Sequence, residues 1–145
     1  MSRLTVKIQL HVLAGITGHA RDAAPLECCG LLAGKDELID AHIRTHNVRA
    51  SEVEYQVDPV EQIAAIKSLR ARGRVILGAY HSHPRTPAVP SATDLAEAHD
   101  AELLYVIVSL CDARPDVRAY RLRGGTFVEI SVVAVPQEPI TNHES

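Results

Sequence analysis

The chain has 145 residues, of which 46% are hydrophobic and 23% charged, and this composition fits a single globular domain. The formal net charge of −3 argues against a general nucleic-acid binder, because such proteins carry a strongly basic surface. No apolar run approaches the ~20 residues of a membrane span, and the N-terminus lacks the apolar core of a signal peptide. We therefore expect a cytoplasmic protein with no membrane partner.

Hydrophobic patterns and turn residues predict that helices and strands alternate along the chain. We expect helices at 9–23, 59–71 and 92–101, and strands at 4–8, 26–33, 38–46, 74–83, 103–110, 117–123 and 126–135. These elements predict one α/β domain over residues 1–135, with a single mixed sheet flanked by about three helices. The polar tail at 136–145 contains two prolines, and we expect it to be disordered.

The periods of two elements also predict how their side chains are arranged. In the strand at 38–46, polar and apolar residues alternate, so we expect a solvated polar face on which His42 and His46 are not metal ligands. In the helix at 59–71, most apolar residues lie near one face, together with one lysine: Val60, Ile63, Ala64, Ile66, Lys67 and Leu69.

The three cysteines are Cys28, Cys29 and Cys111. An odd number without a spaced framework argues against a disulfide scaffold. Cys28 and Cys29 are adjacent on a predicted strand, so they face opposite sides and cannot serve one metal ion. We expect all three to be buried as small apolar side chains. A cysteine nucleophile paired with a histidine is the alternative, but the histidines already form a coherent metal-binding pattern.

The most informative stretch of the sequence begins at His81-Ser82-His83-Pro84. The apolar run at 74–80 precedes it and predicts a buried strand, on which alternate side chains share a face. His81 and His83 therefore point the same way and can bind one metal ion. Pro84 has no N–H for a strand ladder and ends the strand.

Asp94 is a third candidate ligand. The proline-containing loop at 85–90 is stiff, Ser91 can N-cap the next helix, and a carboxylate in its first turn can reach back to the strand end. Two histidines and one aspartate leave a fourth tetrahedral position open for water, as in catalytic zinc sites. Each part of this pattern also has a simpler explanation. Ser91-x-x-Asp94 is an ordinary capping box, although capping is compatible with metal binding by Asp94. A single His-x-His pattern on a strand often binds no metal.

This combined pattern resembles the signature of the JAMM (MPN+) zinc metallopeptidases. The spacing of His81-x-His83, seven residues and Ser91-x-x-Asp94 agrees with that signature residue for residue, and Glu27 stands in the context of the family's upstream glutamate. The segment from Asn47 through Ser51 and Tyr55 to Asp58-Pro59 resembles the short prokaryotic members. The resemblance covers roughly residues 5 to 135. It implies a JAMM/MPN-like (cytidine-deaminase-like) fold with a curved, largely antiparallel sheet.

The resemblance also implies a zinc-dependent peptidase or isopeptidase with one Zn²⁺ per chain, held by His81, His83 and Asp94. Water activated by the zinc would be the nucleophile, Glu27 the base that returns the proton to the leaving amine, and Ser91 an oxyanion donor. The substrate would be a small ubiquitin-like sulfur-carrier protein ending in Gly-Gly, cut at its C-terminus. A homo-oligomer is compatible with the sequence.

Two other classes of function stay open. One is a non-catalytic interaction module of the same fold, against which the intact ligand set argues. The other is a zinc hydrolase with a different substrate, such as a nucleotide deaminase. Zinc deaminases carry a Pro-Cys-x-x-Cys signature, and this sequence has none.

Overall fold

The structure is a computed structural model and describes residues 5–137. In chain order the elements are strand β1 (Thr5–Gln9), helix α1 (Leu10–Ala23), strands β2 (Cys29–Lys35) and β3 (Leu38–Thr45), helix α2 (Pro59–Ala71), strand β4 (Val75–His83), helix α3 (Ala92–Glu97), and strands β5 (Leu104–Ser109), β6 (Asp116–Arg123) and β7 (Thr126–Val135). The predicted α/β fold with one mixed sheet is confirmed. Of the predicted tail, residues 138–145 lie outside the described residues. Between residues 5 and 137, no helix is both long enough and apolar enough to cross a bilayer.

The sheet closes on itself through its first strand. Its strand order is β1-β3-β2-β4-β5-β6-β7, and β1 pairs with both β3 and β7. The two pairs of β1 and the pair β4–β5 are parallel, whereas the other neighbours are antiparallel. Parallel strands need a crossover connection. The crossover from β4 to β5 contains α3, and it brings that helix back to the end of β4.

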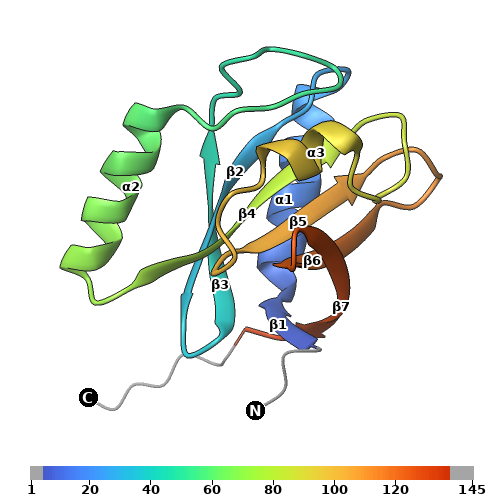
Figure 1. Cartoon of the computed structure of the whole chain (residues 1–145). Coiled ribbons are helices and arrows are strands. Elements are labelled where there is room, and N and C mark those ends of the chain that lie inside the picture. Colours follow the sequence, from blue (N-terminus) through green and yellow to red (C-terminus); the bar gives the residue numbers. More distant parts are fainter. Residues whose placement is uncertain (1–4, 138–145) are drawn as a thin grey trace.

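Helices α1 and α3 lie on opposite faces of the curved sheet (Figure 1). On the α1 side, Val106 and Val108 of β5 belong to the main core cluster. On the other side, Tyr105 and Ile107 of the same strand belong to a second cluster with Ala88. Because side chains alternate along a strand, β5 serves both layers at once.

The polar face of β3 is solvated only in part: Arg44 and His46 are exposed as predicted, whereas α1 covers His42. The His42 ring lies 6.2 Å from the Tyr80 ring, measured between centroids. A Cβ atom at Gly15 would overlap the His42 ring, so glycine at this helix position allows α1 to approach β3 closely. His19 of α1 is hydrogen-bonded to the Tyr80 hydroxyl at 2.7 Å. The part of the polar face at His42 therefore belongs to a helix–sheet contact.

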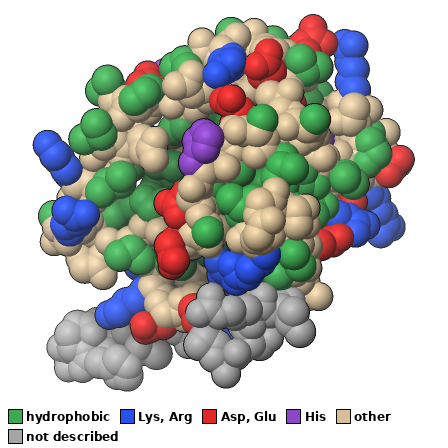
Figure 2. Space-filling view, in the orientation of Figure 1, with side chains coloured by type: hydrophobic (Ala, Val, Ile, Leu, Met, Phe, Trp, Pro, Cys, Tyr) green, Lys and Arg blue, Asp and Glu red, His purple; other side chains and the backbone are tan. Residues whose placement is uncertain are grey.

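Helix α2 begins and ends close to the predicted positions, but its predicted apolar face is mostly exposed. Leu69 is its buried residue, whereas Val60 is 75% and Ile63 is 56% exposed. At about 100° per residue, Val60 lies on the side of the helix opposite Leu69. The weak apolar pattern therefore marked two sides of α2, and the structure buries only one. Figure 2 shows hydrophobic side chains on the surface over this helix.

Most element boundaries lie within two residues of the prediction, and two differ by three residues or more. Strand β2 begins at Cys29, so Glu27 precedes the strand and does not lie on it. Helix α3 ends at Glu97, because the chain then enters a turn that the Tyr105 hydroxyl holds at Asp100. This hydroxyl accepts from Asp100 N at 3.2 Å and donates to Asp100 O at 3.0 Å.

The cysteines follow the prediction in part. Cys28 and Cys29 are buried, whereas Cys111 is exposed because it follows β5 on a surface turn. Burial raises the pKa of both Cys28 and Cys29 to about 11. Both thiols are therefore protonated at neutral pH, which disfavours the cysteine-nucleophile alternative.

Candidate metal centre

The end of β4 brings the two predicted histidines together, and the crossover places Asp94 beside them. His81 and His83 flank Ser82, whose Oγ faces away and accepts a hydrogen bond from Cys28 N at 2.8 Å. His81 Nε2 and His83 Nε2 are 3.3 Å apart. Asp94 Oδ2 lies 3.1 Å from His81 Nε2 and 3.0 Å from His83 Nε2. The three predicted ligand atoms thus converge on one point.

This triangle of atoms fits a metal ion. Tetrahedral zinc with bonds of ~2.0–2.2 Å separates its ligand atoms by ~3.3–3.6 Å. The observed separations of 3.0–3.3 Å are close to that range. The exposed fractions of His81, His83 and Asp94 are only 3%, 3% and 6%. Two imidazole nitrogens and one carboxylate oxygen are a donor set that suits zinc and leaves one position open.

The surroundings of the triangle shift the pKa values of all three candidate ligands, and for His81 and Asp94 the shift favours the form that binds a metal. The His83 Nδ1 proton is donated to the Pro87 carbonyl at 2.8 Å, which directs Nε2 toward the other ligands. Burial lowers the pKa of His81, although the hydrogen bond with Asp94 opposes this. Burial also acts on His83, but its bonds to Asp94 and Pro87 outweigh it and raise the pKa. Burial would raise the pKa of Asp94, yet the hydrogen bonds from His81 and His83 hold it well below its usual range. A neutral His81 and an ionised Asp94 are the forms that coordinate metals.

Ser91 caps α3 in the predicted capping box. Its Oγ accepts from Asp94 N at 3.0 Å, and Asp94 Oδ2 accepts from Ser91 N at 2.9 Å. The same Asp94 oxygen faces both histidines. Capping and ligand placement therefore coexist. The cap uses a lone pair of the Ser91 oxygen, so the hydroxyl proton remains available for donation.

Glu27 lies buried beside the ligands, with 4% of its surface exposed. Strands β2 and β4 are antiparallel, and Cys29 is paired with His81. If the same pairing is continued two residues further, Glu27 lies opposite His83. Alternation along both strands then turns Glu27 to the same face as the histidines. Glu27 N donates to Ser51 O at 2.8 Å, which holds the backbone here although β2 has not begun.

The Glu27 carboxyl is suited to moving protons. Among the described residues, its Oε1 atom is buried and has no hydrogen-bond partner. Burial raises the pKa of Glu27 to about 8, with His83 opposing this shift and Asp94 adding to it. A carboxyl in this state beside a cluster of ligands is typical of a catalytic acid or base.

The sequence assigned no role to Tyr55, but the structure places its ring against His81. The two ring centroids are 4.1 Å apart and the planes 16° apart. Asn47 ties this loop to the site, because its Nδ2 donates to Glu27 O at 3.1 Å and to Glu54 O at 2.9 Å. Hydrophobic periodicity cannot reveal such contacts, since they join an irregular loop to a strand end. In the sequence, only the resemblance of segment 47–59 to the short prokaryotic JAMM proteins indicated that this loop matters.

A second group of potential ligands, His46, Asp58 and Glu61, also lies within 4.8 Å. The His46 side chain is 84% exposed, and both Glu61 carboxylate oxygens already bond to His46. Asp58 Oδ1 caps α2 through Val60 N at 2.9 Å. These contacts are those of a helix terminus, so the buried group is the better metal candidate.

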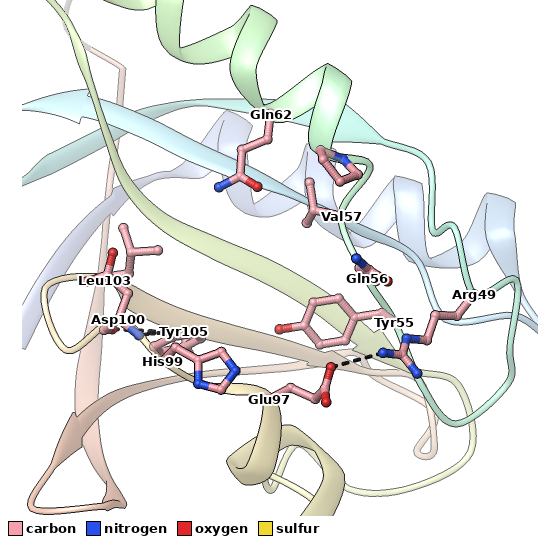
Figure 3. A pocket seen from close by; sticks show the side chains of 11 residues that line it. Arg49, Tyr55, Gln56, Val57, Gln62, Glu97, His99, Asp100, Leu103 and Tyr105 are labelled. Atoms are coloured by element: carbon pink, nitrogen blue, oxygen red, sulfur yellow. Dashed lines mark hydrogen bonds and ion pairs between the residues drawn. The ribbon is translucent and has the colours of Figure 1, made fainter.

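A pocket of about 440 Å³ is lined in part by Tyr55, the residue whose ring also stacks on His81 (Figure 3). It runs between the loop that precedes α2 and the turn that follows α3. An ion pair at 3.2 Å between Arg49 and Glu97 bridges these two segments. The lining residues are Arg49, Tyr55, Gln56, Val57, Pro59, Gln62, Glu97, His99, Asp100, Leu103 and Tyr105.

Comparison with known sequences agrees with this geometry. The family model for prokaryotic homologs of the JAB domain matches residues 10–123. The CysO-cysteine peptidase of Mycobacterium tuberculosis is 34% identical over 133 residues, which cover 90% of this chain and 91% of that protein. The desampylase of Haloferax volcanii is 36% identical over 126 residues, which cover 81% of this chain and 87% of that protein.

Solved structures show the same fold. A solution structure of a protein from Desulfitobacterium hafniense matches with a TM-score of 0.84 at 32% identity, covering 91% of this chain and 94% of that one. A structure described as a JAMM metalloprotease-like zinc site in the proteasome and signalosome matches with a TM-score of 0.57 at 25% identity, covering 89% and 98%. The chain therefore belongs to the prokaryotic JAB-domain family.

Proposed function

We propose that this protein is a zinc-dependent peptidase that hydrolyses a peptide or isopeptide bond at the C-terminus of a small ubiquitin-like sulfur-carrier protein. The observation that carries this proposal is the buried triangle of His81, His83 and Asp94 with a free Glu27 carboxyl oxygen beside it. The relatives named CysO-cysteine peptidase and desampylase support a hydrolase of this kind. The complete donor set argues against a non-catalytic module of the same fold.

In this proposal, His81, His83 and Asp94 hold the zinc ion. When bound, zinc acts as a Lewis acid that polarises a carbonyl group and acidifies water. Glu27 takes a proton from the attacking water and returns it to the leaving amine. In the metal-free protein the pKa of Glu27 is raised to about 8, which brings the group near neutral pH, where it can both accept and release a proton. The Ser91 hydroxyl donates a hydrogen bond to the oxyanion that forms from the scissile carbonyl.

The burial of the ligands favours a slender substrate. A Gly-Gly end brings only backbone to the site, because glycine has no side chain to clash. The pocket beside Tyr55 offers room for residues of the carrier tail. Pro59 and Gln62 of α2 line this pocket, and Val60 and Ile63 of the same helix are exposed. This apolar side of α2 gives the folded body of the carrier a surface on which to dock.

The test compares kcat/KM for two substrates of the zinc-loaded protein. One is an intact ubiquitin-like carrier extended beyond Gly-Gly by one cysteine, and the other is the isolated C-terminal peptide of that carrier. Mass spectrometry measures the released residue. We expect the intact carrier to be cleaved far more efficiently. Equal efficiency would indicate a general zinc peptidase, and no cleavage of either substrate would indicate a non-catalytic module or a zinc hydrolase with another substrate.

A further inference from the structure

The loop that joins His83 to Asp94 is held in place through its carbonyl groups. It contains Pro84, Pro87 and Pro90, which have no N–H to donate. The loop therefore offers more hydrogen-bond acceptors than donors, and its buried carbonyls need donors from other elements.

Three consecutive carbonyls of this loop find such donors. Each accepts a hydrogen bond from a side chain of a different strand: Thr86 O from Ser109 Oγ of β5 at 2.5 Å, Pro87 O from His83 Nδ1 of β4 at 2.8 Å, and Ala88 O from the Tyr120 hydroxyl of β6 at 2.5 Å. Ser109, Tyr120 and Ala88 are all buried. Water cannot easily replace these bonds, so losing one leaves a carbonyl without a partner.

We propose that Tyr120 and Ser109 are positioning residues for the metal site, although neither contacts a ligand. The Pro87 carbonyl keeps the proton on His83 Nδ1 and so leaves Nε2 free for a metal ion. The carbonyls on both sides of Pro87 are anchored to the sheet, which fixes where the Pro87 carbonyl lies. Tyr120 and Ser109 thereby orient His83 through the loop. This role rests on the proposed zinc site.

Tyr105 offers a matched comparison for Tyr120. The two tyrosines are partners across β5 and β6. Both pack edge-on against Phe127, with ring centroids 5.4 Å and 6.0 Å away. The Tyr105 hydroxyl also bonds to a loop backbone, at Asp100. The difference is that the loop at Asp100 carries no candidate ligand. If these hydroxyls only stabilise the fold, removing either one should change the zinc affinity equally.

The experiment measures the zinc dissociation constant by chelator competition for the wild type and for Tyr120→Phe, Ser109→Ala and Tyr105→Phe. Losing a direct partner of a metal-bound histidine typically weakens metal binding ~10–100-fold, and these residues act one step further out. We therefore expect Tyr120→Phe and Ser109→Ala to bind zinc about 3–10-fold more weakly, with Tyr105→Phe within about twofold of wild type. Melting temperatures of the metal-free proteins, measured in parallel, should be similar for Tyr120→Phe and Tyr105→Phe.

Equal weakening in Tyr120→Phe and Tyr105→Phe would overturn the positioning role, because it would indicate a general effect on the fold. Wild-type affinity in both Tyr120→Phe and Ser109→Ala would overturn it as well. Failure of the proposed function gives a different result: a protein that binds zinc but cleaves no carrier still reports the effect of Tyr120 on zinc affinity. A wild type that binds no zinc would overturn both.

Discussion

Tyr55 lies flat against His81, with ring centroids 4.1 Å apart and ring planes 16° apart. The stack covers one face of an imidazole whose Nε2 faces Asp94. Burial raises the pKa of Tyr55 above its usual range, so its hydroxyl stays protonated. The orientation of a candidate ligand on β4 therefore depends on a loop some 25 residues earlier in the chain.

The stack predicts that the Tyr55 ring, and not its hydroxyl, supports metal binding. Tyr55→Ala should weaken zinc binding ~10-fold or more, as expected when a group that orients a metal-bound histidine is lost. Tyr55→Phe keeps the ring and should bind zinc as the wild type does. Chelator competition on both variants measures the difference. Wild-type affinity in Tyr55→Ala would show that the stack does not orient His81.

The buried triangle predicts one zinc ion per chain. His83→Ala removes one of three ligands and should lose most of the zinc. His46→Ala is the matched control, because His46 belongs to the other group of potential ligands. This control should keep the full zinc content. Elemental analysis after dialysis tests both variants, and near wild-type zinc in His83→Ala would contradict the assignment.

Ser91 caps α3 and is proposed to be an oxyanion donor, and these two roles can be tested separately. As the N-cap of α3, its loss in Ser91→Ala should cost ~1 kcal/mol of stability. As an oxyanion donor, its loss should lower kcat ~10²–10³-fold. Ser91→Thr keeps a hydroxyl and a capping oxygen and should lose far less of both. If Ser91 only caps the helix, Ser91→Ala will be less stable but will turn over at nearly the wild-type rate.

His19 predicts how stability depends on pH. Burial lowers the pKa of His19 from 6.5 to about 4, with smaller contributions from Arg44 and His42 and opposition from Asp22. Between these pH values the unfolded chain binds a proton that the folded protein excludes, so the free energy of unfolding falls as the pH is lowered from 6.5 toward about 4. His19→Gln should show a shallower fall. Urea denaturation at about pH 7.5 and about pH 5 measures it, and an unchanged difference between the two pH values in the variant would refute the role of His19.

The positions of the three candidate metal ligands could be predicted from the sequence because local rules place them. Alternation along β4 sets the directions of His81 and His83, and the capping box sets the position of Asp94. A short, proline-rich connection leaves these two local units little freedom relative to each other. The alternating hairpin strands and the start of α2 followed from equally local signals.

Other features depended on contacts between distant segments. Periodicity could not choose between the two sides of α2 marked by Val60 and Leu69, because tertiary packing decides which side is buried. The prediction of a solvated face on β3 failed at His42, because the alternation of a strand's own residues does not show that a helix covers one of them. The hydrogen bonds that Tyr120 and Ser109 donate to the loop between His83 and Asp94 likewise depend on the register of strands that follow the site in the sequence. Gly15 is another example. From the sequence alone it only lowers the helix propensity of α1, but in the structure it allows α1 to contact His42.

The most direct test of a zinc peptidase with Glu27 as its base is the turnover of Glu27→Gln on an intact, extended carrier protein, measured together with its zinc content. Glutamine has a similar shape but cannot accept the proton from water. We expect one zinc ion per chain and a kcat lowered ~10²–10⁴-fold, the usual contribution of a general acid–base group. Turnover within about tenfold of wild type, with zinc bound, would contradict the assignment and place the base elsewhere.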